Sequence, residues 1–151
     1  MKIPHKILST TPLTVHSEEE MRALGSRLAA FLEPGDVLGL VGDLGAGKTR
    51  LVQGILAGLG ASSPAASPTF SLVHEHTDGR LPAAHFDFYR MTSPDEALGL
   101  GWDDYLAGGF VLLVEWADRF DGALMPSHTT WLHISRPDES TRCVSLVKSG
   151  E

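Results

Sequence analysis

The chain has 151 residues, 42% of them hydrophobic, and this length favours a single domain over residues 1–151 with its own core. Its 12 Lys and Arg against 19 Asp and Glu give a net charge of −7 without any basic run, which argues against unaided binding of nucleic acid. The single cysteine excludes an internal disulfide, and without a signal-peptide pattern or an apolar run long enough to cross a bilayer we expect a soluble, cytoplasmic protein.

Helical and strand-like patterns alternate in the first part of the chain, and strands predominate towards its end. A capping box that begins at Ser17 precedes apolar residues at helical spacing, so a helix is expected up to Glu33. The further predicted elements are, in chain order, a strand over Val37–Val41, a helix over Arg50–Leu59, strands over Phe70–His74 and Ala83–Tyr89, a helix after a second capping box at Ser93, a strand over Phe110–Glu115, and a hairpin of Trp131–Ile134 with Cys143–Val147. This order predicts an α/β fold with a mixed, mainly parallel sheet flanked by helices.

A glycine-rich segment joins the strand over Val37–Val41 to the helix that follows it. Its residues fit the pattern G-x-x-x-x-G-K-S/T at every position: Gly42, Asp43, Leu44, Gly45, Ala46, Gly47, Lys48 and Thr49. Glycine lets backbone N–H groups converge on phosphate oxygens, and the next helix directs its positive end at the same anion. We expect Lys48 to reach the β- and γ-phosphates and Thr49 to bind Mg²⁺. The segment, extended to Arg50, therefore predicts an ATP and Mg²⁺ site.

Two carboxylates lie in or at the end of strand-like runs. Glu115 comes directly after an apolar run, which places it at the carboxyl edge of a sheet, where open α/β sheets bind ligands. It is a candidate magnesium ligand, and a solvated loop glutamate is the alternative. Asp87 alternates with Phe86 and Phe88, so it would face away from them. It could bind the metal or orient the attacking water, and a surface carboxylate is an equally consistent interpretation.

Other residues are weaker candidates. Thr69 follows a small-residue loop that could carry it to the γ-phosphate, although a plain turn explains it as well. His74 and His76, at positions i and i+2, would share one face of a strand, but no other Cys or His pair with zinc-site spacing supports a metal there. Trp102 and Trp116 fit packing roles better than base stacking.

Four segments together resemble the TsaE (YjeE) family, the bacterial ATPase subunit of tRNA threonylcarbamoyladenosine biosynthesis. They are the phosphate loop Gly42–Thr49, Ser67–Phe70 with Leu72 and Val73, His85–Arg90, and Val114–Trp116. The resemblance extends from the first helix to Trp116, where Ala117 replaces the usual proline. It implies a small P-loop domain that hydrolyses ATP slowly and acts with the subunits TsaD and TsaB, so that tRNA is reached only through that assembly.

The resemblance also implies roles for individual residues, each by its place in a matching motif. Thr49 and Glu115 become magnesium ligands. Asp87 becomes a catalytic or metal-linked carboxylate, and Thr69 lies near the γ-phosphate. Lys48 is also a catalytic candidate, by its own place in the phosphate loop.

The sequence argues against three other functions of P-loop proteins, of which the kinase and the binding module are kept as alternatives. A small-molecule kinase needs an arginine-bearing lid, and the eight arginines here are scattered. A GTPase of the common type needs an Asn-Lys-x-Asp segment, and the chain has no asparagine. A non-hydrolysing, nucleotide-dependent binding module would lack carboxylates placed like Asp87 and Glu115. The adenine pocket has only Ser17 and Glu18 as weak candidates.

Overall fold

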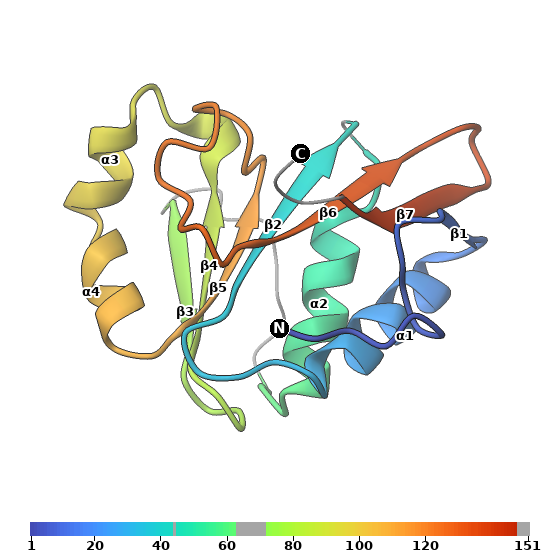
Figure 1. Cartoon of the computed structure of the whole chain (residues 1–151), viewed down its shortest axis with the longest axis horizontal. Helices are drawn as coiled ribbons and strands as arrows, with labels where there is room; N and C mark the ends of the chain where they lie inside the picture. Colours follow the sequence, from blue (N-terminus) through green and yellow to red (C-terminus); the bar gives the residue numbers. More distant parts are fainter. Residues whose placement is uncertain (44, 63–71, 148–151) are drawn as a thin grey trace.

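The structure is a computed structural model that describes residues 1–43, 45–62 and 72–147 (Figure 1). Its elements follow in the order β1 (Leu13–Val15), α1 (Glu18–Ala29), β2 (Val37–Gly42), α2 (Lys48–Gly58), β3 (Val73–His76), β4 (Ala83–Asp87), the 3₁₀ turn η1 (Phe88–Arg90), α3 (Pro94–Gly99), α4 (Trp102–Ala107), β5 (Val111–Glu115), β6 (Thr130–Ser135) and β7 (Arg142–Leu146). None of the described helices is long and apolar enough to cross a membrane.

The strands form a sheet in the order β1-β7-β6-β2-β5-β4-β3. The four central strands, β6, β2, β5 and β4, run parallel, and the strands outside them pair antiparallel. The apolar composition of β5 explains its central place, because a parallel strand is covered by helices on both faces. The predicted α/β fold with a mixed sheet is therefore confirmed, as is the closing hairpin of β6 and β7.

Helices cover the two faces of the sheet and divide the core between them. Alternate residues of β5 belong to different hydrophobic clusters. Val111 and Leu113 face the cluster formed with α1 and α2, and Leu112 and Val114 face the cluster that contains Trp102. α1 and α2 lie together on one side of the sheet in Figure 1, and α3 and α4 lie on the other. The P-loop strand β2 and the strand β5 thus lie side by side in the middle of the fold, in parallel register.

Three local predictions need correction or fall partly outside the described residues. The strand predicted over Ala83–Tyr89 ends at Asp87, because the Asp87 carboxylate accepts a hydrogen bond from the Tyr89 N–H (3.0 Å) and begins η1. The second capping box is incomplete: Ser93 is the N-cap of α3 but its side chain makes no capping hydrogen bond, and Glu96 accepts from the N–H of the preceding residue, Thr92 (2.8 Å). The strand predicted from Phe70 is described only from Val73 and extends to His76.

Candidate functional site

The phosphate loop connects the end of β2 to the start of α2, as the sequence predicts. Gly42 has a φ of 137°, and a Cβ built there would lie 1.8 Å from the Ile134 carbonyl oxygen of β6. Any side chain at this position would force β2 and β6 apart. Gly47 precedes the helix with a φ of 106°, a conformation that glycine adopts without strain. Leu44 lies outside the described residues.

Lys48 is buried in the loop and folds back on it. Its Nζ donates hydrogen bonds to the carbonyl oxygens of Gly42 (3.0 Å) and Asp43 (2.7 Å). The ammonium also lies 4.3 Å from the centre of the Trp116 ring. Burial lowers the pKa of Lys48, and the nearby carboxylates, Glu115 foremost, oppose that shift. The loop therefore holds a largely desolvated cation where the motif predicts one.

Trp116 is held over this cation by an unusual backbone conformation. Its φ is 57°, in the left-handed region that costs a non-glycine residue about 1–2 kcal/mol. Its ring lies 4.8 Å from that of Tyr89. Trp102, by contrast, is a packing residue, fully enclosed in the core with its indole N–H donated to the Leu124 carbonyl oxygen (3.2 Å). The packing role is thus confirmed for Trp102, while Trp116 borders the site.

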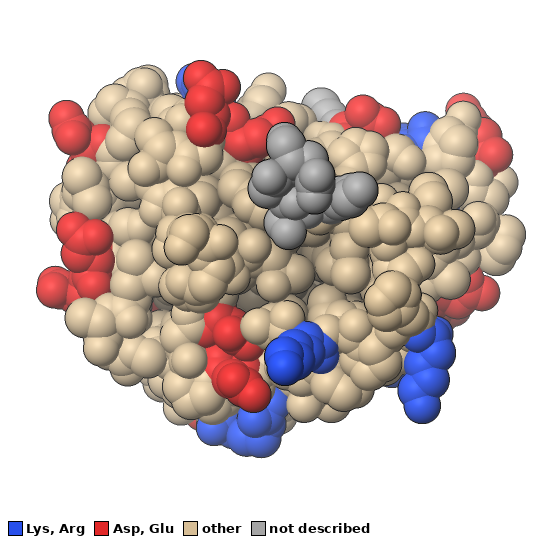
Figure 2. Space-filling view, in the orientation of Figure 1, with Lys and Arg blue, Asp and Glu red and all other residues tan. Residues whose placement is uncertain are grey.

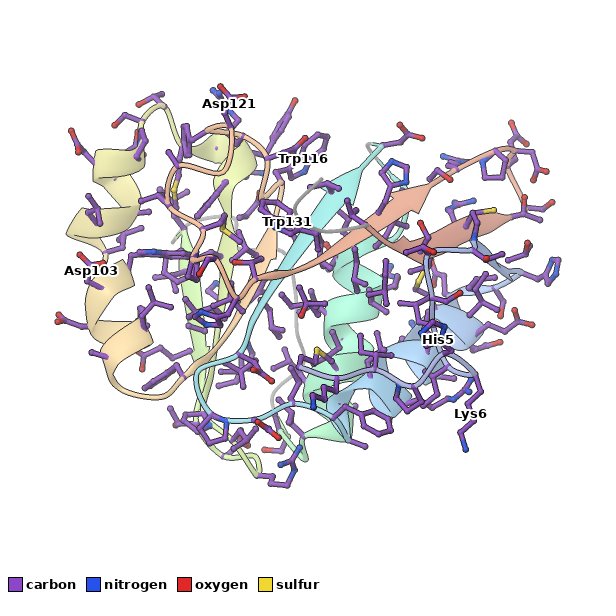
Figure 3. The ribbon with its side chains drawn as sticks, in the orientation of Figure 1. His5, Lys6, Asp103, Trp116, Asp121 and Trp131 are labelled. Carbon is purple, nitrogen blue, oxygen red and sulfur yellow. The ribbon has the colours of Figure 1, made fainter. Side chains whose placement is uncertain are left out.

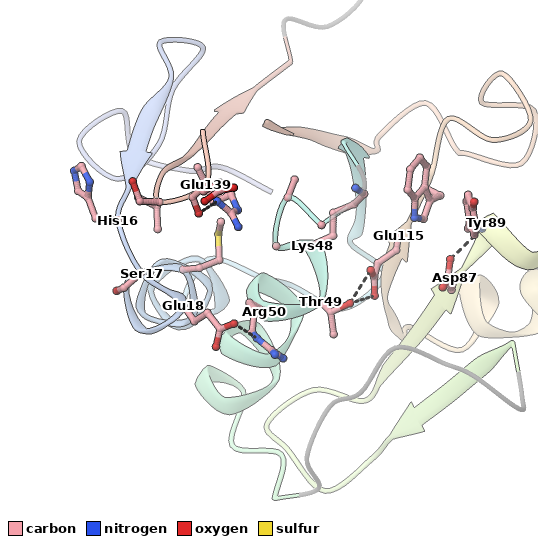
Figure 4. Close-up of a pocket in the computed structure, with 18 of the residues that line it drawn as sticks. His16, Ser17, Glu18, Lys48, Thr49, Arg50, Asp87, Tyr89, Glu115 and Glu139 are labelled. Carbon is pink, nitrogen blue, oxygen red and sulfur yellow. Dashed lines mark hydrogen bonds and ion pairs between the residues drawn. The ribbon is translucent and has the colours of Figure 1, made fainter. Parts of the chain in front are cut away.

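Glu115 is brought directly against Thr49. The Thr49 hydroxyl donates to Oε1 of Glu115 at 2.9 Å and approaches Oε2 at 3.2 Å (Figure 4). Glu115 ends β5 in parallel register with Leu40 of β2, and 4% of its surface is exposed. It is therefore not a solvated loop residue. Its Oε2 also lies 2.6 Å from Nε2 of His85 on β4.

Asp87 lies beside Glu115 at the same edge of the sheet. The two residues are register partners at the ends of β4 and β5. Asp87 is 5% exposed, so the interpretation as a surface carboxylate is wrong. Both carboxylates and Lys48 line one pocket. Thr69, the remaining predicted catalytic residue, lies outside the described residues.

The pocket has a volume of about 680 Å³ and extends well beyond the phosphate loop. Its far side is formed by the end of β1, the start of α1, the turn between β6 and β7 and the start of β7, with the lining residues Val15, Ser17, Met21, Glu139, Ser140 and Arg142. Arg50 lines it too and forms an ion pair with Glu18 (Nε to Oε1, 3.3 Å), which joins α2 to α1. The weak candidates Ser17 and Glu18 therefore border the same pocket as the phosphate loop.

Sequence reasoning missed two parts of this site. His85 received no role from the sequence, although it begins one of the family-like segments and lies two positions before Asp87, a spacing that puts both on one face. The residues of the β6–β7 turn gave no local signal, because their place beside the loop follows from the order of strands in the sheet.

The described residues contain no group of three or more His, Cys, Asp or Glu side chains arranged to hold a metal ion. His74 and His76 do not line the pocket. The oxygen atoms near Thr49 instead suit Mg²⁺, which commonly binds one or two protein groups and completes its coordination shell with phosphates and water.

Comparisons with known proteins identify one family. Residues 15–144 match the family model described as "Threonylcarbamoyl adenosine biosynthesis protein TsaE". The chain is 43% identical over 132 residues to the tRNA threonylcarbamoyladenosine biosynthesis protein TsaE of Bacillus subtilis, covering 87% of this chain and 82% of that protein. Identity to the protein of the same name from Nostoc sp. is 42% over 141 residues, covering 91% and 85%.

A solved structure has the same fold. The crystal structure of Bacillus subtilis YdiB superposes with a TM-score of 0.74 at 37% identity, covering 92% of this chain and 85% of that one. The family match spans the phosphate loop, Asp87 and Glu115, so sequence and fold lead to one assignment. The chain belongs to the TsaE family.

Proposed function

We propose that this chain binds ATP with Mg²⁺ and hydrolyses it slowly, as a subunit of the machinery that forms threonylcarbamoyladenosine in tRNA. Family membership supports the pathway, because the related proteins are named for it. The observation that carries the ATPase proposal is the hydrogen bond from Thr49 to Glu115 directly beside Lys48. The bond joins the hydroxyl and the carboxylate that are proposed to bind the metal, and the phosphate-binding Lys48 lines the same pocket.

Each group has a defined task in this proposal. The loop N–H groups and Lys48 bind the phosphates, and Lys48 exchanges its bonds to the Gly42 and Asp43 carbonyls for phosphate oxygens. The Thr49 hydroxyl donates its one hydrogen bond to Glu115, which leaves the lone pairs of the Thr49 oxygen free for Mg²⁺. Bound Mg²⁺ would neutralise charge on the phosphates. Asp87 orients water beside Glu115.

The pocket also has room for the nucleoside. About 680 Å³ exceeds what the phosphates require, and its far side carries both apolar and polar groups. We place the adenine between the start of α1 and the β6–β7 turn, near Ser17 and Met21, with the phosphates at the loop.

The chain is proposed to work in the cytoplasm with TsaD- and TsaB-type subunits and to reach tRNA only through them. The net charge of −7 supports an indirect contact with tRNA. Figure 2 shows Asp and Glu spread over the face drawn there and few Lys or Arg, most of them near its lower margin.

The direct test is ATP turnover by the chain alone, with both partner subunits, and with partners plus tRNA, each with and without Mg²⁺. We expect Mg²⁺-dependent release of inorganic phosphate that rises when the partners are present. Phosphoryl transfer to a metabolite by the free chain would replace the proposal with a kinase. ATP binding without hydrolysis under every condition would replace it with a non-hydrolysing binding module.

A further inference from the structure

We propose that His85 is a positioning residue that fixes the Glu115 carboxylate beneath the phosphate loop. The inference rests on the proposed ATPase function and adds a residue to it. His85 lies on β4, is fully buried, and places Nε2 at 2.6 Å from Oε2 of Glu115. A bond this short to a carboxylate is at the strong end of the range for protein hydrogen bonds.

The direction of this bond follows from the chemistry of its partners. An ionised carboxylate only accepts hydrogen bonds, so the proton between the two atoms belongs to Nε2 of His85. The other ring nitrogen, Nδ1, is buried and has no hydrogen-bond partner among the described residues. Among the described residues, the His85 ring therefore has a single hydrogen-bond partner, Glu115.

The strand register explains why a histidine is suited to this task. His85 pairs with Leu113, two residues before Glu115, so its ring must extend diagonally along the sheet to reach the carboxylate. An apolar side chain of similar size would fill the space without donating a proton. Glutamine, whose amide nitrogen lies at a similar distance from the backbone, could donate from nearly the same place.

Among the described residues, Glu115 thus has two side-chain donors, and they come from different parts of the fold. Thr49 belongs to the phosphate-loop helix, the part that must rearrange its contacts when phosphates bind. His85 belongs to the buried sheet. Its bond can hold the carboxylate in one orientation whatever the loop binds, and we infer that this keeps Glu115 aligned with Thr49.

Two variants distinguish the hydrogen bond that His85 donates from the space that its side chain fills. His85→Leu removes the donor and His85→Gln keeps one, and thermal unfolding shows whether each is folded. With partners present, we expect His85→Leu to lower kcat about 10- to 100-fold and to raise the Mg²⁺ concentration for half-maximal turnover, as loss of a group that orients a metal-site ligand commonly does. We expect ATP affinity to change less than about threefold, and His85→Gln to recover most of kcat. Wild-type turnover in His85→Leu, or equal impairment of both folded variants, would overturn the proposal.

A second measurement needs neither nucleotide nor turnover. In the protein labelled with ¹⁵N-histidine, with His85→Gln used for assignment, we expect a protonated Nε2 whose proton resonance moves in Glu115→Gln. An Nε2 without a proton, or a resonance indifferent to Glu115→Gln, would overturn the positioning role. A wild-type chain that never hydrolyses ATP, with partners and tRNA present, would reject the proposed function instead, and the spectra alone would then decide the role of His85.

Discussion

At the scale of single residues, buried polar side chains define the site by binding one another. Glu115 accepts from Thr49 on one side and His85 on the other, and Lys48 lies close enough for Glu115 to oppose the lowering of its pKa. Such groups are costly to bury unless they are paired. Their arrangement at one end of β5 therefore points to a binding function and not to stability alone.

Replacing Glu115 by Ala should damage hydrolysis more than nucleotide binding. The loop amides and Lys48 would still bind phosphates. Thr49 would lose its carboxylate partner, and a bound Mg²⁺ would no longer be held in alignment. Loss of such a contact costs about 3 kcal/mol of barrier, on the order of a hundredfold in rate. The measurement is ATP affinity and Mg²⁺-dependent turnover side by side, with Glu33→Ala, an exposed glutamate outside the pocket, as control. Full turnover in Glu115→Ala would move the metal role to Asp87.

His76 should make the fold sensitive to acid. It is 6% exposed, and neither ring nitrogen has a hydrogen-bond partner among the described residues. Burial is the main cause that lowers the pKa of His76. The charges of His85 and His74 lower it further, and the charge of Asp78 opposes the shift. Because the pKa of His76 is lower in the folded state, its contribution to the free energy of unfolding is complete above the unfolded-state pKa of about 6.5. That contribution declines as the pH falls below this value. Between pH 7.5 and 5 the midpoint of thermal unfolding should fall more in wild type than in His76→Leu, and equal declines would contradict this.

At the scale of elements, the contact between α1 and α2 depends on glycine. A Cβ built on Gly54 would lie 2.1 Å from the backbone oxygen of Arg22, so Gly54→Ala should force the helices apart. We expect a loss of about 1–3 kcal/mol, beyond any gain in helix propensity. Gly99 in α3 is the matched control, because a Cβ there meets nothing within 4 Å and Gly99→Ala should be neutral or stabilising. Denaturant unfolding of both variants checks this, and equal stability would refute a glycine-dependent contact.

The parts of the fold that could be predicted are those with local causes. The apolar runs of β2 and β5, the Ser17 cap of α1 and the glycines of the phosphate loop each act within a few residues, and each was identified from the sequence. The end of β4 was missed because a side chain, Asp87, begins η1 in place of continued strand pairing.

The parts of the site that could not be predicted depend on register and strand order. Whether His85 reaches Glu115 is decided by how β4 aligns with β5, and no spacing along the chain encodes that alignment. The β6–β7 turn borders the pocket because β6 pairs with β2 across the sheet.

At the scale of the whole molecule, charge governs what the chain can bind alone. With a net charge of −7, its affinity for tRNA at physiological salt should be no better than about 10⁻⁴ M. Filter binding over a range of salt concentrations measures this. A tight, salt-sensitive complex formed without partners would contradict the indirect route to tRNA.

The most direct test of the central claim, an ATP site at the phosphate loop, is the affinity for ATP and Mg²⁺ of wild type, Lys48→Ala and Lys6→Ala by titration calorimetry. Lys48 is the loop's buried cation, whereas Lys6 is exposed on the N-terminal segment beside α1, far from Trp116 (Figure 3). We predict that Lys48→Ala weakens binding at least about a hundredfold, since a charge-assisted bond to phosphate is lost, and that Lys6→Ala binds as wild type does. Undiminished ATP binding by a folded Lys48→Ala protein would contradict the account.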